Sequence, residues 1–528
     1  MKNKKIFTLC MACLLVVQLI VVFWFGMQKQ GYHYDEYYSY YSSNVTYALV
    51  PTDMEWKDTS EISSEFMVLE DADLSYGMVK LMQSLDVHPP LYYYLLHTVC
   101  GLSKGIFSKW QGLAINLIFF VLSWLTLAGI TKEITKNDRK KIFAVCALFG
   151  FSPAIFSGIM FIRMYMMLTF FCLLILYVHV RAIMRAEKTV IGFFVPVFLL
   201  SFAGFHTHYY FAVFLFFLAA AESLSLFFHK AGRKTSFIYA GTVLAGMAAS
   251  VIVYPACLKH IFRGYRGTEA QDAFFDLGNI DERLSFFFDL TNEYVFGNML
   301  VVLLLVVIVL GLTQHVKNRE KMDLGSSSKR AYLLTFFVTA GYFLVVAKTA
   351  LLNAEEAIRY EMPVYGLLIL LLVIAVGRLL EGFTTPKNFR WMEGIFAGLM
   401  ILTLIGEILG LASGKVCFLY PEDAVNIAWA EENNKEPIAY IYNRTNQWMI
   451  WNDSEELMQY DQIYFVESGH DELEADHILS DTEHFYVYVM RGEDAERTFK
   501  MLMDANGGFF NINKIRELLY CDLYEVMR

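Results

Sequence analysis

Charged residues are scarce in this chain of 528 residues, at 18% of the total, whereas soluble globular proteins carry about 25%. Basic residues are the rarer kind, because 43 lysines and arginines accompany 53 aspartates and glutamates, for a formal net charge of −10. This balance excludes a simple basic nucleic-acid-binding protein. The 56% of apolar residues excludes intrinsic disorder, since disordered chains have too few apolar residues to form a core.

Cysteine and proline are also scarce, with eight and ten residues. These numbers exclude a disulfide-rich secreted scaffold and a collagen-like chain. The CxxC motif at Cys10 and Cys13 lies inside an apolar run, where a zinc or redox role is not expected. Aromatic residues, by contrast, reach 16%, which is typical of helices that meet lipid and its interfaces. The composition therefore predicts a membrane protein.

Long apolar runs dominate the first 411 residues. A spanning helix needs about 20 mostly apolar residues, with about 17–25 tolerated. Eleven segments satisfy this requirement, namely 6–26, 112–131, 142–161, 164–180, 190–206, 209–228, 235–257, 294–314, 331–349, 361–377 and 391–411. Residues 89–102 are apolar but too short to cross, and we expect an interfacial or re-entrant helix there. The sequence predicts an α-helical polytopic membrane protein with about 11 transmembrane helices plus an interfacial helix.

The positions of the basic residues predict the orientation of the chain. Lysines precede the first run and basic residues then cluster in alternate loops, which places the N-terminus and those loops in the cytoplasm. The first outer loop, 27–88, holds eleven acidic and three basic residues. We therefore expect a multi-pass protein of the cell membrane whose C-terminal segment is extracytoplasmic. The first run lacks a clear small-residue cleavage site, so it is predicted to be a retained anchor.

The last 117 residues differ from the rest in charge, with 23 acidic and nine basic residues. Three strands and one helix are expected in this segment, at 437–443, 462–467, 484–490 and 493–508. The segment has no GxGxxG or GxxxxGK motif, so nucleotide binding is not predicted. We expect a transmembrane domain at 1–411 and a small, soluble, acidic α/β domain at 412–528.

Ionisable residues gather at the predicted outer ends of the runs, although charge is costly at membrane depth. The segment YHYDEYYSYYS, after the first run, places Asp35 and Glu36 among six tyrosines. The segment DVHPPLYYYLLH presents Asp86 and His88 before two prolines, which favour the start of a helix. Taken singly, the two segments are also explained as an interfacial tyrosine belt and as a helix entry signal.

Two arginines occupy similar positions in the sequence. Arg163 and Tyr165, in FIRMYMML, open one run, and Arg359 and Tyr360, in IRYEMPVY, open another whose first turn is expected to contain Pro363. Two arginines at outer helix starts suit a phosphate or pyrophosphate, which they would bind through charge-assisted hydrogen bonds. The alternative explanation is an arginine that extends its charged end to the interface.

Two histidines, His206 and His208 in FHTHYYF, lie between two runs on the predicted outer side. Their spacing of two residues fits a metal site only weakly, and no carboxylate is adjacent. The favoured interpretation is a pair of interfacial histidines whose hydrogen bonds are satisfied.

In their order along the chain, these clusters resemble GT-C glycosyltransferases of the family 39 or protein-mannosyltransferase-like kind. The resemblance covers residues 1–411 and rests on Asp35-Glu36, HPPLYY (88–93), RMY (163–165) and the RY…P element at Arg359, Tyr360 and Pro363. It implies a hexosyl- or pentosyltransferase of the cell envelope. Such enzymes move a sugar from a polyprenyl-phosphate donor to an extracytoplasmic glycan, lipid or protein acceptor, with no nucleic acid involved.

The resemblance also implies roles for particular residues. Asp35 is the predicted base, and Glu36 is its orienter or an alternate base. The predicted ligands of the donor phosphate are Arg163, Tyr165, Arg359, Tyr360 and His88, of which His88 is alternatively a ligand of the acceptor. Direct attack by the acceptor would invert the anomeric centre. Some GT-C enzymes use a divalent cation and others do not, so no metal ligands are assigned.

Two other functions remain as alternatives. A transporter or flippase of lipid-linked sugars would place polar groups near the middle of the membrane, in interrupted helices of related halves. Here the polar groups gather at one predicted rim, which favours the enzyme. A structural assembly protein, with its acidic tail bound to a partner, leaves the one-sided clusters unexplained.

Overall fold

The computed structural model describes residues 2–44, 53–228, 232–316, 326–471, 479, 482–507 and 511–528. The chain forms two compact units. The first unit comprises Met1–Gly26, Lys80–Leu95 and Gly112–Cys417, and the second comprises Met27–Val79, Leu96–Gln111 and Phe418–Arg528. The acidic tail thus belongs to a unit that also contains two segments from early in the chain. The proposed domain boundary at residues 411 and 412 stays a prediction.

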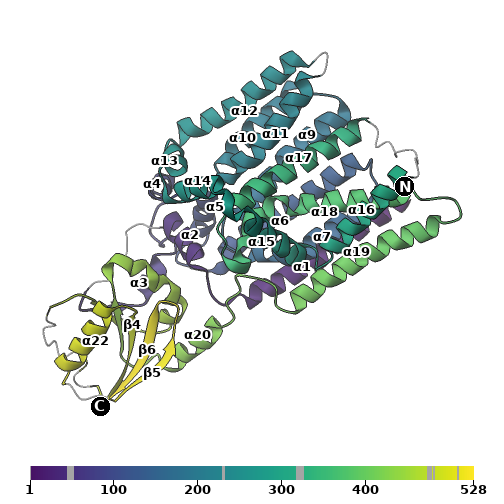
Figure 1. Ribbon diagram of the computed structural model, residues 1–528. Coiled ribbons are helices and arrows are strands. Elements are labelled where there is room, and N and C mark those ends of the chain that lie inside the picture. The colour runs from purple at the N-terminus through teal and green to yellow at the C-terminus, as the bar shows by residue number, and fades with distance from the viewer. Residues whose placement is uncertain are drawn as a thin grey trace. The chain divides into compact units, whose positions relative to one another are not determined.

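Apolar helices build the first unit, and Figure 1 shows α9 to α12 and α17 side by side. Within the described ranges, eight helices are long and apolar enough to cross a membrane: α1 (Lys2–Gln28), α6 (Lys109–Ile134), α9 (Tyr165–Arg185), α11 (Tyr210–Phe227), α12 (Arg233–Val253), α17 (Ser326–Thr349), α18 (Ile358–Glu381) and α19 (Phe389–Ala412). Two bent pairs raise the number to ten, namely α7 (Arg139–Phe151) with α8 (Pro153–Met160), and α15 (Ile280–Leu290) and η3 (Thr291–Val295) with α16 (Leu300–Val316).

Shorter helices complete this part of the chain. They are α4 (Tyr76–Leu85), α5 (Leu91–Gly101), η1 (Val190–Phe194), α10 (Val195–Phe205), α13 (Ala256–Phe262), α14 (Tyr265–Phe275), η2 (Leu277–Asn279) and η4 (Ala354–Ala357). The predicted run 190–206 forms η1 and α10, which together are shorter than the other spans. The apolar segment 89–102 contains α5, whose 11 residues extend about 16 Å and cannot cross a bilayer. Its interfacial position stays a prediction.

The predicted fold class, an α-helical polytopic membrane protein with a small C-terminal α/β region, is confirmed. The sequence did not indicate the bend of 99° that precedes α16. Gly297 and Asn298 have positive φ angles of 52° and 68° there, so the helix cannot continue through them. A Cβ on Gly297 would lie 2.3 Å from the backbone of Gly406, so glycine is required for this close approach of two backbones.

Helix α18 is the core of the first unit, because 18 of its 24 residues are buried. It packs against α7, α9, α16 and α17. The sequence suggested that Pro363 lies in the first turn of this helix. The helix begins at Ile358, however, so Pro363 lies in its second turn. The amino end of this largely buried helix carries Arg359 and Tyr360, and packing fixes the positions of both.

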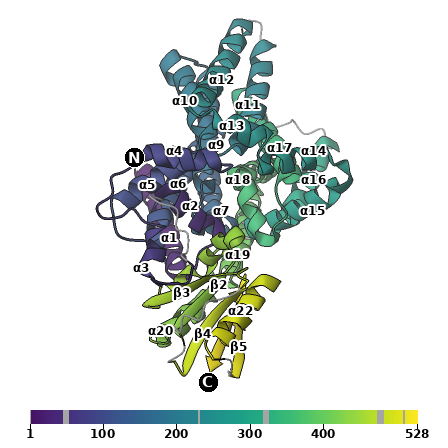
Figure 2. The same cartoon turned by 90° about the vertical axis from the view of Figure 1, so that its left-hand side faces the viewer.

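A six-stranded sheet forms the centre of the second unit, and Figure 2 shows α22 beside it. Its strands are β1 (Glu55–Asp58), β2 (Ile438–Tyr442), β3 (Gln462–Glu467), β4 (His484–Met490), β5 (Asn511–Glu517) and β6 (Cys521–Met527), in the order β1-β3-β2-β4-β6-β5. Strand β2 pairs in parallel with β3 and β4, and the other pairs are antiparallel. The helices of this unit include α2 (Tyr34–Asn44), α3 (Ser60–Ser64), α20 (Asp423–Glu432), η5 (Arg444–Asp453), α21 (Ser454–Leu457) and α22 (Glu493–Ala505).

The three predicted strands and the predicted helix are confirmed as β2, β3, β4 and α22. Their continuous or strongly periodic apolar patterns made them visible in the sequence. Strand β5 was not predicted, because it is an edge strand with exposed, mostly polar residues. Strand β1 was missed because it comes from the first loop, more than 400 residues before its partner β3.

Candidate active site

Arg163 lies buried between α8 and α9 in the first unit, with 2% of its surface exposed. Its Nη1 donates a hydrogen bond to the Tyr93 hydroxyl at 3.0 Å, and its Nη2 lies 3.3 Å from Nε2 of His88. Nδ1 of His88 is 3.0 Å from a carboxylate oxygen of Asp86. Because arginine can only donate, His88 accepts at Nε2 and donates from Nδ1 to Asp86. Asp86 therefore fixes the tautomer of His88.

The Asp86 carboxyl remains ionised in this position. Burial acts to raise its pKa, but His88 and Arg163 together hold the pKa below its ordinary value. The result is a chain from carboxylate to imidazole to guanidinium, in which each group orients the next. This chain fixes the direction of the Arg163 guanidinium.

Arg359 is also buried, with 4% of its surface exposed. Its Nη2 donates to the hydroxyl of Tyr360 at 3.2 Å, and its Nη1 lies 3.3 Å from a carboxylate oxygen of Glu356. The guanidinium lies over the rings of Phe161 and Tyr360, at 5.2 and 4.9 Å from their centroids. Cation–π contacts on two rings and a hydrogen bond therefore hold this second charge in one orientation.

Aromatic rings connect the two arginines. The ring of Tyr165 lies 5.9 Å from that of Tyr360 and 5.4 Å from that of His208, and His208 lies 5.9 Å from His88. Tyr210 contacts both His208, at 5.0 Å, and Tyr360, at 6.2 Å. We call the predicted phosphate ligands Arg163, Tyr165, Arg359, Tyr360 and His88, which the structure brings together, the arginine group.

Three helices begin at the arginine group. Tyr165 and Tyr210 are the first residues of α9 and α11, and Tyr360 lies in the first turn of α18. The amino end of a helix carries a partial positive charge and backbone N–H groups without intrahelical partners. Together with two guanidinium groups, this arrangement favours an anion. Sequence reasoning missed Tyr210, and it left His208 as an interfacial residue because its neighbours along the chain carry no charge.

The predicted acidic pair lies in the second unit, at the start of α2, and its two members differ. Asp35 has 29% of its side chain exposed, and its carboxylate is 3.7 Å from Nδ1 of His33. Glu36 is fully buried, pairs with the buried Lys29 at 2.8 Å and accepts a hydrogen bond from the backbone N–H of His33 at 2.6 Å. Lys29 also donates to the carbonyl of Phe418 at 2.7 Å. Glu36 thus belongs to a closed internal pair, whereas Asp35 is accessible.

Lys29 was missed by sequence reasoning, although it lies directly after the first apolar run. Burial lowers the pKa of Lys29, and the adjacent Glu36 acts in the opposite direction. Two more carboxyl groups lie near this lysine. Burial raises the pKa of Asp423 to about 6, and burial together with Asp423 raises the pKa of Glu455 to about 7. The start of α2 is therefore an acidic region with one deeply buried cation.

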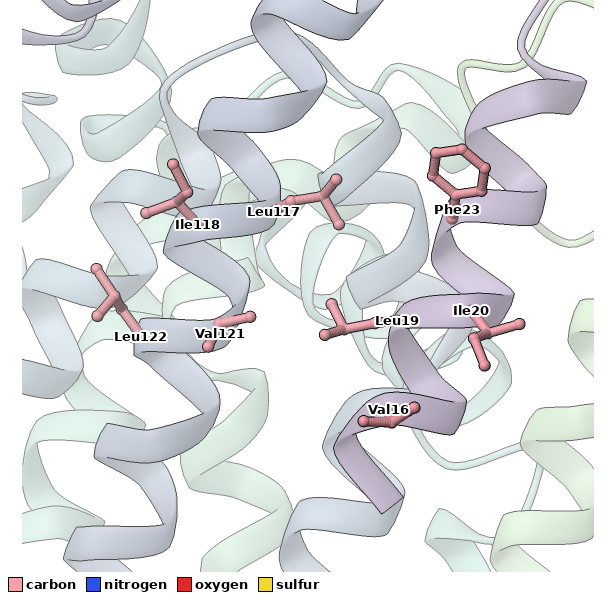
Figure 3. Close-up of a pocket in the computed structure, with 8 residues that line it drawn as sticks. All are labelled: Val16, Leu19, Ile20, Phe23, Leu117, Ile118, Val121 and Leu122. Atoms are coloured by element: carbon pink, nitrogen blue, oxygen red, sulfur yellow. The ribbon is translucent and has the colours of Figure 1, made fainter. Parts of the chain in front are cut away.

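An apolar groove of about 630 Å³ runs between α1 and α6 in the first unit (Figure 3). Its lining consists of Val16, Leu19, Ile20, Phe23, Leu117, Ile118, Val121 and Leu122. All eight are aliphatic or aromatic, so the groove offers no hydrogen-bonding side chain. Such a surface suits a hydrocarbon chain.

Within the ranges that the structure describes, no three or more His, Cys, Asp or Glu side chains form a group that could hold a metal ion.

No protein-family model matches the chain, and no curated protein is similar to it in sequence. The structure is similar to the crystal structure of ArnT from Cupriavidus metallidurans in the apo state. The two share 9% sequence identity with a TM-score of 0.49, and the similarity covers 97% of each chain.

Proposed function

We propose that this protein is a membrane glycosyltransferase that moves a hexose or pentose from a polyprenyl-phosphate donor to an extracytoplasmic acceptor. The observation that carries the proposal is the arginine group. Two buried guanidinium groups and three helix amino ends converge there, and fixed positive charge of this kind favours an anion. A phosphate that remains attached to its lipid would supply this anion.

Asp35 is the proposed base in this reaction. It removes a proton from an acceptor hydroxyl, whose oxygen attacks the anomeric carbon while the bond from that carbon to the phosphate oxygen breaks. The electron pair leaves with the polyprenyl phosphate, and the anomeric centre is inverted. General-base catalysis contributes about 10²–10⁴-fold to such a step. The partial exposure of Asp35 supports this role, since a base must reach its substrate.

The arginine group is proposed to stabilise the negative charge that develops on the leaving phosphate. Preorganised charges of this kind are often the largest single contribution to catalysis. Arg163 and Arg359 are suited to it because burial and ring contacts fix their directions before the donor arrives. The groove between α1 and α6 is the proposed place for part of the polyprenyl chain.

A flippase for lipid-linked sugars is the second candidate, and one experiment separates the two. The gene is deleted in the source organism, and mass spectrometry follows the envelope glycans and the polyprenyl-phosphate sugars. A transferase predicts that one sugar disappears from the envelope while its donor accumulates on the outer leaflet. Donor that accumulates on the inner leaflet would instead identify the flippase, and an unchanged envelope would exclude both.

A further inference from the structure

Helix α2 carries tyrosines on two different sides. Tyr37 and Tyr40 are at most 1% exposed, and both rings contact Phe107. These residues form the core between α2 and the rest of the second unit. Their burial accounts for how the helix is held in place.

The other side of α2 carries Tyr34, Tyr38 and Tyr41, which are only partly buried. Their spacing of four and three residues places them in one row along the helix. They are not needed to complete the core that Tyr37 and Tyr40 form. Asp35, the proposed base, is adjacent to Tyr34 in sequence and one turn from Tyr38.

Two tryptophans from the acidic tail meet this row of tyrosines. The ring of Trp448 lies 4.7 Å from that of Tyr34, and the ring of Trp451 lies 4.7 Å from that of Tyr41 and 6.1 Å from that of Tyr38. Both tryptophans belong to η5 and are also only partly buried. We call Tyr34, Tyr38, Tyr41, Trp448 and Trp451 the aromatic platform.

The platform is held rigidly on one side. The indole N–H of Trp451 donates a hydrogen bond to a carboxyl oxygen of the buried Glu65 at 2.6 Å. Tyr520, from the turn before β6, packs edge-on against Trp448 at 5.9 Å. A rigid aromatic surface loses little conformational entropy when it binds a partner, so it is well suited to recognition.

The charges around the start of α2 favour a neutral, hydroxyl-rich partner. Asp35, Asp423 and Glu455 are acidic, while the nearby lysines have other contacts. Lys29 pairs with Glu36, and the Nζ of Lys109 donates to the carbonyl of Lys29. A phosphate-bearing acceptor would be repelled here. A sugar, by contrast, offers C–H groups that stack on aromatic rings and hydroxyl groups that donate to carboxylates.

We infer that the aromatic platform binds the acceptor and that this acceptor is a carbohydrate, with a hydroxyl directed at Asp35. The inference rests on the proposed function and deepens it, because it names the acceptor class and gives the acidic tail a part in binding. A sugar ring stacked on Trp448 and Tyr34 would lie next to the base. The tail would then supply half of the acceptor site through η5.

The test uses the purified full-length protein in lipid nanodiscs. Donor lipid is extracted from the deletion strain, and the same strain supplies envelope polysaccharide, lipid and protein fractions as acceptors. The variants are Trp448→Leu in η5 and Tyr34→Leu in α2. Because they lie on two different elements, one variant can still test the inference if the other protein fails to fold and accumulate in the membrane. Trp56→Leu, in β1, is the matched control, since Trp56 is 37% exposed in the same unit but lies outside the platform.

We expect transfer to the polysaccharide fraction, and we expect each platform variant to raise the KM for it about tenfold, the loss of one stacking contact. The KM for the donor and the behaviour of Trp56→Leu should not change. Transfer to protein or lipid alone, an unchanged KM in both variants, or a raised KM in Trp56→Leu alone would overturn the inference. If polysaccharide quenches the tryptophan fluorescence of the wild type but no sugar is transferred, the proposed transferase function is refuted and the proposed carbohydrate site is retained. If neither quenching nor transfer is observed, the proposed function and the proposed site are both refuted.

Discussion

The arginine group of the first unit and the acidic region of the second unit solve opposite electrostatic problems. Arg163 and Arg359 are buried beside rings and hydroxyl groups, and Arg359 also pairs with Glu356, so each guanidinium keeps a permanent charge in a fixed direction. The carboxyl groups near the start of α2 have raised pKa values instead, at about 6 for Asp423 and about 7 for Glu455. The arginine group therefore holds permanent positive charge, whereas the acidic region contains carboxyl groups that gain and lose protons near neutral pH.

This difference matches the two halves of the proposed reaction. Departure of a phosphate needs charge that does not move, while activation of a hydroxyl needs a group that can take up a proton. Within the acidic region the same division recurs between neighbouring residues. Asp35 is accessible, but Glu36 is fixed by Lys29 and by the N–H of His33.

Replacement of Asp35 by asparagine should have the largest effect. The amide cannot take the proton from the acceptor, so we expect kcat to fall by about 10²–10⁴-fold with an unchanged KM for the donor. Initial rates of sugar transfer in nanodiscs measure the effect. Asp58→Asn, at an exposed carboxylate of the same unit, is the control and should retain its rate. A wild-type rate in Asp35→Asn would remove Asp35 from the mechanism.

Replacement of Arg359 by lysine tests the other half of the comparison. Lysine keeps the charge but loses the planar fork and its contacts with the rings of Phe161 and Tyr360, so we expect kcat to fall by about 10²–10³-fold. The measurement is kcat together with the KM values of donor and acceptor. Arg266→Lys, in a half-exposed pair with Glu269, should behave as the wild type. A defect confined to the KM of the acceptor would place Arg359 on the wrong substrate.

Glu36→Gln should separate stability from catalysis. It leaves the Lys29 charge buried without its partner, so we expect the free energy of unfolding to fall by about 3–5 kcal/mol. The double variant Lys29→Met, Glu36→Leu should recover part of that loss, and Lys57→Met, at a surface pair, should cost less than about 1 kcal/mol. Thermal unfolding in nanodiscs gives all three values. Normal stability with activity as low as that of Asp35→Asn would make Glu36 the base.

The arginine group shows how far sequence reasoning could reach. Arg163 and Arg359 could be predicted because each opens an apolar run, and an ionisable residue in that position is conspicuous against an apolar background. Packing then decides which helix starts meet, and the sequence holds no signal for that. His208 contacts His88 and Tyr165 only because α11 begins beside α9 and α18.

The second unit was less predictable. Its parallel strands were visible because buried strands are continuously apolar, but strand β1 and helix α2 contact tail residues that lie more than 400 residues further along the chain. Trp448 and Trp451 look like ordinary loop residues in the sequence. Their meaning depends on the tyrosines that they contact, which lie in another part of the chain.

The smallest expected effect concerns the pH dependence of stability. It tests whether Glu65, a buried carboxyl group of the second unit, titrates near neutral pH as the carboxyl groups of the acidic region do. Burial raises the pKa of Glu65 to about 8, although the hydrogen bond from Trp451 opposes this shift. The pKa is higher in the folded than in the unfolded state, so the protonated form stabilises the fold at low pH, and this contribution is lost as the pH rises through about 8.

We therefore expect the unfolding temperature of the wild type to fall between pH 6 and pH 9 by more than that of Glu65→Gln. The glutamine is neutral throughout and keeps an oxygen that can accept from Trp451, so the variant should change the slope with pH and leave the aromatic platform in place. Arg359 should make no such contribution to the pH dependence of the unfolding temperature, because its charge does not titrate in that range. Parallel pH profiles for wild type and Glu65→Gln would show that the carboxyl is already ionised at neutral pH and that the contrast between the two regions does not extend to this residue.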